Sequence, residues 1–448
     1  MTDFLASAQL ALGLPAEPVH EQGRGALPSA FAVTAMACAS VAAAGQAVAQ
    51  LLLEQTGQRP EVSVDRRLAS FWFATSLRPI GWTIAPLWDP IAGDYACRDG
   101  WIRLHTNAPQ HRASVERVLG HCTDRATLAT RVTQWRKGDL EQAVVAAGGC
   151  AAQMRSQAAW QVHPQGQAVN AEPLIMRSDN DSPTPLHWLG TAQRPLAGVK
   201  VLDLTRVLAG PVASRLLAGL GAQVLRIDPP TWSEPGVVPE VTLGKRCAHL
   251  DLHVKADRET FERLLGEADI LLHGYRADAL ERLGYDPANR QRLAPGLIDV
   301  GLNAYGWSGP WRNRRGFDSL VQMSSGIAEA GMHWKGTSVP TPLPVQALDH
   351  ATGYLIAAAA VRALSTRLQH GIGGSARLSL ARTAKWLMEG TSDPSLPLAP
   401  PTPADEASTL EMTAWGPARR LQAPLQIAGA PLQWPYPAGE LGSSPPRW

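Results

Sequence analysis

One carboxylate stands at the start of a strongly apolar segment. Asp349 lies in QALDHATGYLIAAAAVRAL, where small apolar residues predominate, and we predict a long buried helix over residues 347–368. A carboxylate in the first turn of such a helix can cap the N-terminus and interact with the helix dipole, or it can act as a nucleophile or base. The residues alone leave both interpretations open.

Metal chemistry has little support in the sequence. His105 and His111, with Asp99 nearby, show no compact ligand spacing. The five cysteines form no C-x-x-C pair, and their odd number is typical of reduced thiols in a cytoplasmic protein. We therefore predict no metal site and a cytoplasmic location.

Residues 199–230 would position these groups, because they have the length and order of one βαβ unit. The apolar run 199–204 predicts a buried strand, and Gly210 and Pro211 mark a turn into a helix that has one apolar stripe. A second strand follows over residues 223–227. Any ligand should meet the carboxyl edge of this sheet, beside the turn at Ala209.

A dinucleotide site is not favoured at that turn. The turn lacks G-x-G-x-x-G, and the close glycine pair, Gly219 and Gly221, follows the helix instead of preceding it. The unit could therefore be an ordinary crossover of an α/β sheet.

The remaining patterns continue the α/β alternation. We predict an apolar run at 250–252, a helix at 258–267, strands at 270–272, 295–302 and 377–380, and a helix at 318–330. Earlier in the chain, residues 88–104 predict a hairpin with its turn at Asp99-Gly100, surrounded by short helices. That pattern indicates a small α+β domain.

Three segments resemble the family III CoA-transferases of the CaiB/BaiF type. They are LDLTRVLAGPVASRLLAGLGAQVLRID, RRGFDSLVQMSSG and QALDHATGYLIAAAAVRAL. The resemblance is strong over about residues 197–385 and weak over 75–165. It implies an α/β fold in which a Rossmann-like parallel sheet domain is joined to a smaller α+β domain and long Ala-rich helices.

The resemblance also implies the chemistry. Asp349 matches the family's catalytic aspartate, which attacks an acyl-CoA thioester to give a mixed aspartyl anhydride and CoA thiolate. A carboxylic acid then takes over the acyl group or the CoA. Backbone N–H groups at the turn Ala209-Gly210 and after Gly326 are candidates to stabilise the tetrahedral centres. The substrates would be acyl-CoA and an acceptor acid, with no permanently bound cofactor.

Positions that resemble CoA contacts of the family are spread over several loops. They are Leu208, Ala209, Leu250, Asp251, His253, Gly274, Arg282, Arg315 and Asp318. The segment GKRCAHLDLH, residues 244–253, resembles the family segment that approaches the nucleotide, where basic groups would bind CoA phosphates. The basic residues of that segment, Arg282 and Arg315 could equally be solvated surface charges. At Leu208, Pro229, His253 and Gly274 the residue type departs from the family pattern. These departures keep open the alternative of a pseudoenzyme that binds CoA, or a partner chain, without turnover.

Phe317 distinguishes two chemistries within the superfamily. The α-methylacyl-CoA racemases, which belong to the superfamily that this chain resembles, have a histidine at this position. That histidine shares the α-proton transfer with the aspartate. Phe317 therefore favours a transferase over the racemase alternative. His350 could in principle replace that histidine, but adjacent helical residues point about 100° apart.

The chain shows a weak internal repeat. Residues 30–54 predict a second Ala-rich helix, and an offset of 316 lays the first segment over the second, so that Val33 meets Asp349. One catalytic site per chain follows, and the domain order looks circularly shifted relative to the family. We predict a degenerate repeat of 347–388 at 1–74, a small α+β domain at 75–165, a connecting arm at 166–196, a CoA-binding domain with the catalytic aspartate at 197–388 and a Pro-rich tail at 389–448.

Composition and charge limit the partners. A net charge of +2 in 448 residues argues against nucleic acid. The uncharged segment 25–53 is mostly alanine with polar residues interspersed, so a buried helix is favoured over a membrane span, and no export signal opens the sequence. The resemblance implies a homodimer; a monomer would indicate instead that the repeated half mimics a second subunit.

Overall fold

A seven-stranded sheet forms the centre of the molecule. The computed structural model describes residues 3–276, 278–390 and 396–448. The strand order is β10-β9-β8-β11-β12-β13-β7, with β7 antiparallel and all other neighbours parallel. In that order the strands are β10 (Lys245–His249), β9 (Gln223–Asp228), β8 (Lys200–Asp203), β11 (Ile270–His273), β12 (Ile298–Asn303), β13 (Ile372–Ser379) and β7 (Met176–Pro183).

This sheet confirms the predicted α/β fold with a Rossmann-like parallel domain. Counted from β8, the parallel strands run 3-2-1-4-5-6, the order of a doubly wound sheet. Helix α9 (Ala209–Gly219) begins at the predicted turn, and all of its residues are buried. Alternate strand residues face two hydrophobic cores, because successive side chains of a strand point to opposite faces.

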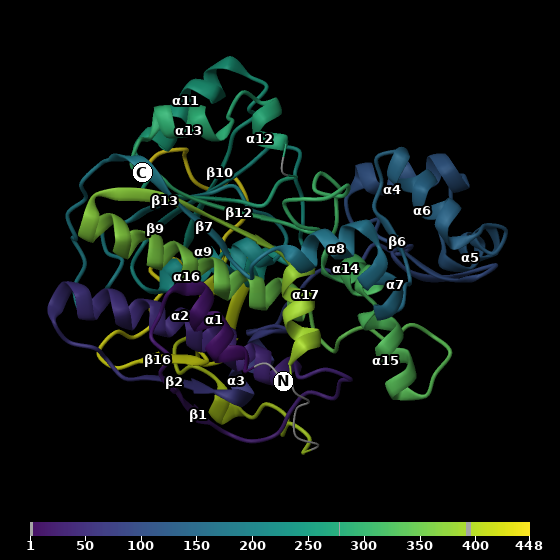
Figure 1. The fold of residues 1–448 in the computed structure, drawn as a ribbon, viewed down its shortest axis with the longest axis horizontal. Coiled ribbons are helices and arrows are strands. Elements are labelled where there is room, and N and C mark those ends of the chain that lie inside the picture. Colours follow the sequence, from purple (N-terminus) through teal and green to yellow (C-terminus); the bar gives the residue numbers. More distant parts are fainter. Residues whose placement is uncertain (1–2, 277, 391–395) are drawn as a thin grey trace.

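One core lies under the long helices and the other under shorter ones. Val201 and Ile270 pack with α9 and α16 (Ala347–His370), whereas Leu202 and Leu271 pack with α11 (Lys255–Gly266). Two short helices complete the second face: α12 (Ala279–Arg282) and α13 (Pro287–Leu293). The short helix α10 (Val238–Val241) contacts α9 instead. The αβ alternation predicted from the sequence is thus built on both faces of the sheet (Figure 1).

The two Ala-rich segments form neighbouring helices. Helix α2 (Val33–Thr56) packs along α16, and α1 (Phe4–Leu12) packs on α2 (Figure 1). By length and composition α2 could cross a membrane, but 89% of its most apolar window is buried inside the protein. Small side chains let the helices approach closely, so α2 has the packing of a core helix.

The small domain has its own core. It contains β4 (Gly93–Cys97), β5 (Gly100–Leu104) and β6 (Ala151–Gln153), with α4 (Pro109–Leu119), α5 (Arg125–Val132) and α6 (Lys137–Ala146). The hairpin and its turn at Asp99-Gly100 are as predicted. Figure 1 shows this domain at one end of the molecule, next to α14 (Asp318–Ser325).

Several sequence predictions were wrong in detail. The helix predicted at 318–330 breaks at Gly326, whose φ is 89°, into α14 and α15 (Ile327–Lys335). The predicted connecting arm is not irregular: it contains most of α8 (Pro164–Ala171), which follows α7 (Gln157–Val162), and the edge strand β7. The sequence showed no sign of β7, because its pairing partner β13 is distant in the chain. The run 250–252 follows strand β10 and is not a strand itself.

The first and last segments pair with each other. A three-stranded sheet joins β1 (His20–Gln22), β2 (Val62–Asp65) and β16 (Leu425–Ile427), and α3 (Arg66–Trp72) follows β2. Another joins β14 (Glu411–Thr413), β15 (Gly416–Arg420) and β3 (Leu77–Pro79). The predicted Pro-rich tail is therefore part of the fold over its described residues; 391–395 lie outside them.

Candidate active site

A cavity of about 340 Å³ lies at the carboxyl edge of the sheet. Its walls come from segments 204–209 after β8, 274–279 after β11, 302–304 at the end of β12 and 314–317 before α14. The order of the strands reverses between β8 and β11, and such a point leaves a crevice at the carboxyl ends. Asp349 from α16 also lines this cavity.

Asp349 does not cap its own helix. Asp318, at the start of α14, accepts a hydrogen bond from the Asp349 backbone N–H at 3.0 Å and thereby caps α16 from a neighbouring element. No described residue donates a hydrogen bond to the Asp349 carboxylate itself. The geometry thus resolves the two interpretations of the sequence, since the capping role falls to Asp318 and the Asp349 carboxylate faces the cavity.

Both carboxylates are buried, and both have raised pKa values. Burial raises the pKa of Asp318 to about 6, against the opposing effect of the hydrogen bonds it accepts. Burial, and then the neighbouring charge of Asp318, raises the pKa of Asp349 well above its usual range. Two carboxyl groups that share a site hold their protons as a pair. A poorly hydrated carboxylate of raised pKa is more nucleophilic than one in water.

Four arginines line the cavity and make it a site for an anion. They are Arg206, Arg276, Arg314 and Arg315. Arg314 pairs with Glu141 of the small domain at 2.9 Å, and Glu141 also pairs with Arg155. The exposed Arg315 donates to the Gly148 carbonyl at 3.2 Å. The small domain is thus held against the sheet domain at the cavity, with Arg315 at its surface.

The turn before α9 is strained. Val207 has φ of 65°, which is uncommon for a β-branched residue, and its N–H donates to Glu234 at 2.9 Å. This conformation leads directly into Ala209, whose carbonyl approaches Gly353 of α16. Of the two predicted N–H sites, the turn after Leu208 lies at the cavity, whereas Gly326 packs against the backbone at residues 156–157 and does not line it.

The predicted CoA contacts fall into two groups. Ala209, Gly274 and Arg315 line the cavity with Asp349, Leu208 precedes Ala209 as the N-cap of α9, and Asp318 is buried against Asp349. The other four do not line it: Leu250, Asp251, His253 and Arg282.

Each residue of the second group has a local role. The Leu250 side chain is in the hydrophobic core, Asp251 accepts from the His253 backbone N–H at 3.0 Å, and the exposed Arg282 pairs with Asp278. Sequence alone could not separate the groups, because all of them follow strands at the same edge.

Two histidines of the small domain reach the site and were not predicted there. The His105 ring stacks on Phe317 with centroids 3.8 Å apart, and His111 lies edge-on to Phe317 at 5.8 Å. Burial lowers the pKa of both imidazoles, with that of His111 at about 4, so both are neutral near pH 7. The only sequence signal was their proximity in the chain, which was considered for a metal site and did not fit one.

His350 packs away from the cavity, on the side where the first half lies. Its ring stacks on Phe73 at 5.0 Å, and burial lowers its pKa to about 3. It therefore does not replace the racemase histidine. Among the described residues, no group of three histidine, cysteine, aspartate or glutamate side chains could hold a metal ion.

Comparison with known proteins gives a consistent match for this half of the chain. Residues 196–405 match the model of CoA-transferase family III. An acetyl-coenzyme A transferase of Hypoxylon pulicicidum is 32% identical over 235 residues, which are 49% of this chain and 39% of that protein. A probable fatty acyl-CoA transferase of Mycobacterium tuberculosis is 33% identical over 207 residues, 42% of this chain and 50% of that protein.

Among solved structures, a CaiB/BaiF family protein from Brucella suis can be superposed with 24% sequence identity and a TM-score of 0.36. The superposed region is 50% of this chain and 65% of the Brucella protein. The chain spans about half the length or less of the two curated relatives named above.

Proposed function

Because residues 196–405 of this chain belong to CoA-transferase family III, we propose that the protein transfers CoA from an acyl-CoA thioester to a carboxylic acid. One observation carries the proposal. The Asp349 carboxylate faces a cavity at the carboxyl edge of the sheet, while Asp318 takes over the capping of its helix. A carboxylate that is buried, lines a cavity and serves no structural bond is suited to act as a nucleophile.

In the first step a carboxylate oxygen of Asp349 attacks the thioester carbonyl carbon. A C–O bond forms, the C–S bond breaks, and the products are a mixed aspartyl anhydride and CoA thiolate. The thiolate then attacks the aspartyl carbonyl, which releases the donor acid as a carboxylate and leaves Asp349 as a CoA thioester. No proton is gained or lost, because each step exchanges one anion for another.

The acceptor acid reverses the sequence. Its carboxylate attacks the aspartyl thioester and expels CoA thiolate, and the thiolate then attacks the acceptor's carbonyl carbon. The products are the new acyl-CoA and the free Asp349 carboxylate. Backbone N–H groups at the start of α9 would stabilise the oxyanions, and the four cavity arginines would bind CoA phosphates. The chemistry requires no permanently bound cofactor.

The test is chemical trapping of the anhydride or thioester. After incubation with an acyl-CoA, hydroxylamine should convert Asp349 to a hydroxamate that is detectable by peptide mass spectrometry. Asp349→Asn should remove both adduct and turnover, a loss on the order of 10⁴-fold or more. Asp139→Asn, at an exposed carboxylate of α6, is the matched control. Retained transfer by Asp349→Asn would sink the assignment.

Two alternatives remain as outcomes of that experiment. Exchange of only the α-proton of a 2-methylacyl-CoA with solvent would indicate the racemase chemistry, against which Phe317 argues. Binding of CoA without any adduct would indicate the pseudoenzyme.

Location and assembly are also proposals. Cys97, Cys122, Cys150 and Cys247 are free thiols, which supports a reducing compartment such as the cytoplasm. The resemblance implies a homodimer, whereas a monomer would indicate that the first half of the chain mimics a second subunit. The absence of nucleic acid and membrane partners stays a prediction.

A further inference from the structure

A second cavity of about 210 Å³ adjoins the Asp349 cavity. The two share Val207, Trp232 and Phe317 as common walls. The side cavity lies between the small domain, which supplies residues 86–89, 105, 107 and 108, and the sheet domain, which supplies 232–237. A group attached to a thioester at Asp349 could therefore extend past Phe317 into it.

The two cavities differ sharply in charge. Four arginines line the Asp349 cavity, whereas neither lysine nor arginine is among the residues that line the side cavity. The charged side chains there are Asp89 and Glu234, which are already paired with Arg112 and Arg226. His105 is neutral, because its burial lowers its pKa.

Two arginines lie over aromatic walls of the side cavity without lining it. Arg103 lies over the Trp88 ring at 4.8 Å and pairs with Asp94. Arg206 lies over the Trp232 ring at 4.6 Å, pairs with Asp228 and lines only the Asp349 cavity. A second carboxylate on the substrate would therefore be buried beside Asp89 and Glu234 without a partner, which is strongly unfavourable.

The remaining walls are mostly apolar and aromatic, with Asn107 and Ser233 as the neutral polar residues. Leu87, Val237, Trp88, Phe317 and the His105 ring also line this small volume. An apolar cavity of about 150 Å³ holds benzene, so one of this size suits a single aromatic ring or a branched chain.

We propose that the side cavity binds the acyl group of an aromatic or branched-chain monocarboxylic acyl-CoA, while CoA occupies the arginine-lined cavity. This inference rests on the proposed transferase function. It assigns selectivity to uncharged acyl groups and excludes dicarboxylic ones.

The test compares benzoyl-CoA and isovaleryl-CoA with succinyl-CoA as donors. We expect kcat/KM to be at least about 100-fold higher for the first two, on the order of the penalty for an unpaired buried carboxylate. Equal or faster transfer from succinyl-CoA would overturn this inference and leave the transferase function standing. Failure of every thioester to form an adduct would overturn the proposed function, and this inference with it.

A gain-of-function variant locates the acyl group. Leu87→Arg places a cation at the rim of the side cavity and should raise kcat/KM for succinyl-CoA at least tenfold relative to isovaleryl-CoA. Leu10→Arg, at an exposed leucine of α1, is the control and should change neither. An unchanged ratio in Leu87→Arg would place the acyl group elsewhere and overturn the proposal.

An independent observation concerns two parts of the chain, the first half (residues 1–165) and the second half (residues 197–388). Helices α2 and α16 both have 24 residues, and both end at a left-handed glycine, Gly57 and Gly371. The residues before them, Ala32 and Gln346, share nearly the same φ and ψ. The offset is 314, not the 316 expected from the sequence, and it also relates the starts of α3 and α17 (Leu380–Glu389).

The strands around these helices repeat as well. Strand β2 has β1 as a parallel neighbour and β16 as an antiparallel one, just as β13 has β12 and β7. Each half pairs with the antiparallel strand that follows the other half in the chain. Strand β7 follows the first half but pairs with β13 of the second, and β16 follows the second half but pairs with β2 of the first.

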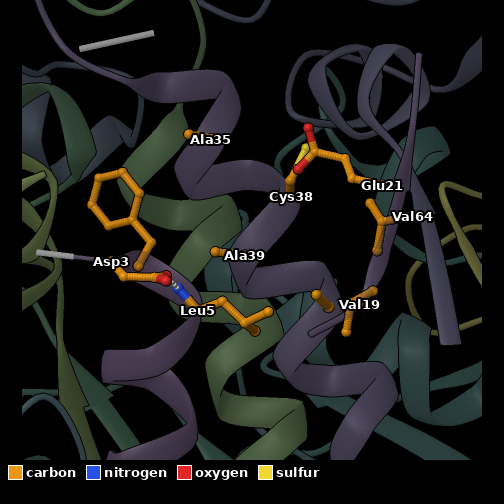
Figure 2. Close-up of a pocket in the computed structure, with 10 residues that line it drawn as sticks. Asp3, Leu5, Val19, Glu21, Ala35, Cys38, Ala39 and Val64 are labelled. Carbon is orange, nitrogen blue, oxygen red and sulfur yellow. Dashed lines mark hydrogen bonds between the residues drawn. The ribbon is translucent and has the colours of Figure 1, made fainter. Parts of the chain in front are cut away.

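The corrected offset places Ala35, and not Val33, at the position of Asp349. Ala35 lines a cavity of about 380 Å³ together with Asp3, Glu21 and Cys38 (Figure 2). Asp3 caps α1 through the Leu5 and Ala6 N–H groups, and Glu21 pairs with Arg66. This cavity is therefore the counterpart of the active site without its nucleophile.

We infer that the first half takes the place of a second subunit, so that the chain works as a monomer with one active site. The site is complete within one chain, because His105, His111 and Glu141 come from the first half and contact residues 314–317 of the second.

Light scattering and dilution test this inference. We expect a mass of 48.0 kDa and a specific activity independent of protein concentration. Twice that mass at the assay concentration, with activity that falls on dilution as dimers dissociate, would overturn it. The measurement of mass does not depend on the proposed activity.

Discussion

At the scale of single residues, the arrangement of Asp318 and Asp349 is the central feature of the site. The two carboxylates are buried together, and the one that accepts the helix N–H groups frees the other to face the cavity. Burial, and then the charge of Asp318, keeps the pKa of Asp349 above its usual range. The pH profile of the enzyme should therefore report on the pair.

Asp318→Asn should move the acidic limb of the profile of kcat/KM to lower pH. In the wild type, activity should fall as the pH drops through the raised pKa of Asp349, because only its ionised carboxylate is a nucleophile. Removing the like charge lowers the pKa of Asp349, so the variant should keep its carboxylate ionised at lower pH. An unmoved limb in Asp318→Asn would contradict the coupling; Asp139→Asn is the control.

Arg315→Ala should weaken CoA binding about tenfold, which corresponds to the loss of one charge-assisted contact with phosphate. Titration calorimetry with CoA, which we expect to bind with micromolar affinity or more weakly, measures the change. Arg136→Ala is a matched control, because Arg136 is an exposed arginine of the small domain whose ion pair with Asp99 is 3.6 Å long. Equal weakening in both variants would argue against an arginine-lined CoA site.

At the scale of elements, the contact between α9 and α16 positions the nucleophile. A Cβ at Gly353 would lie 2.5 Å from the Ala209 carbonyl oxygen and 2.9 Å from the Val212 Cβ. The first turn of α9, with its N–H groups, can approach Asp349 only because Gly353 has no side chain. In the first half the equivalent residue is Ala39, where no active site needs this approach.

Gly353→Ala should push α9 away from α16. We expect a loss of about 1–3 kcal/mol in the free energy of unfolding, together with a fall in kcat, since backbone cannot yield as a flexible side chain does. Urea unfolding and steady-state kinetics measure the two effects. Gly138→Ala in α6, where a Cβ would meet only Gln153 at 3.6 Å, should be neutral or stabilising. The same outcome for both variants would refute the steric argument.

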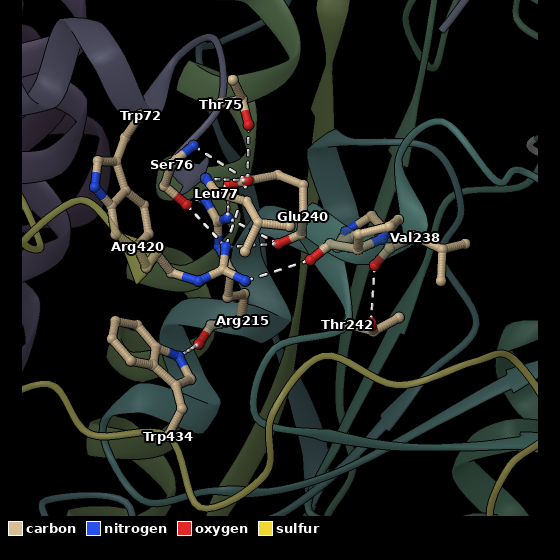
Figure 3. A network of polar contacts seen from close by, with 12 residues as sticks. Trp72, Thr75, Ser76, Leu77, Arg215, Val238, Glu240, Thr242, Arg420 and Trp434 are labelled. Carbon is tan, nitrogen blue, oxygen red and sulfur yellow. Dashed lines mark hydrogen bonds and ion pairs between the residues drawn. The ribbon is translucent and has the colours of Figure 1, made fainter. Parts of the chain in front are cut away.

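At the scale of the whole molecule, one buried glutamate joins three parts of the chain (Figure 3). Glu240 of the sheet domain accepts hydrogen bonds from Ser76 and Leu77 of the first half. It also pairs with Arg215 of α9 and with Arg420 of the C-terminal segment. Burial alone would raise its pKa, but Arg215 and Arg420 outweigh burial and hold it at about 2.

Stability should therefore depend on Glu240 in acid. Its pKa is lower in the folded protein than its ordinary value of 4.5, so its contribution is complete above that value and is lost as the pH falls towards 2. Glu240→Gln should destabilise the protein by about 3–5 kcal/mol at pH 7 and flatten the stability curve between pH 5 and 3. Urea unfolding across that range measures both, with the exposed Glu281→Gln as control. An unchanged slope would contradict the network's role.

The sequence by itself determined the parallel α/β unit, the two Ala-rich helices and Asp349 as the candidate nucleophile. These features are encoded locally, because apolar spacing, turn residues and helix composition act over a few turns of chain. It also determined that Arg315 and Gly274 follow strands at one edge of the sheet.

Only the tertiary structure decided which of those edge residues share a cavity and which, like Leu250, enter the core. It brought Asp318 to the N-terminus of α16, stacked His105 on Phe317 and exchanged β7 and β16 between the halves. The physical reason is that these contacts join segments far apart in the chain. Their partners are selected by packing and by the pairing of buried polar groups, which leave no periodic signal in the sequence.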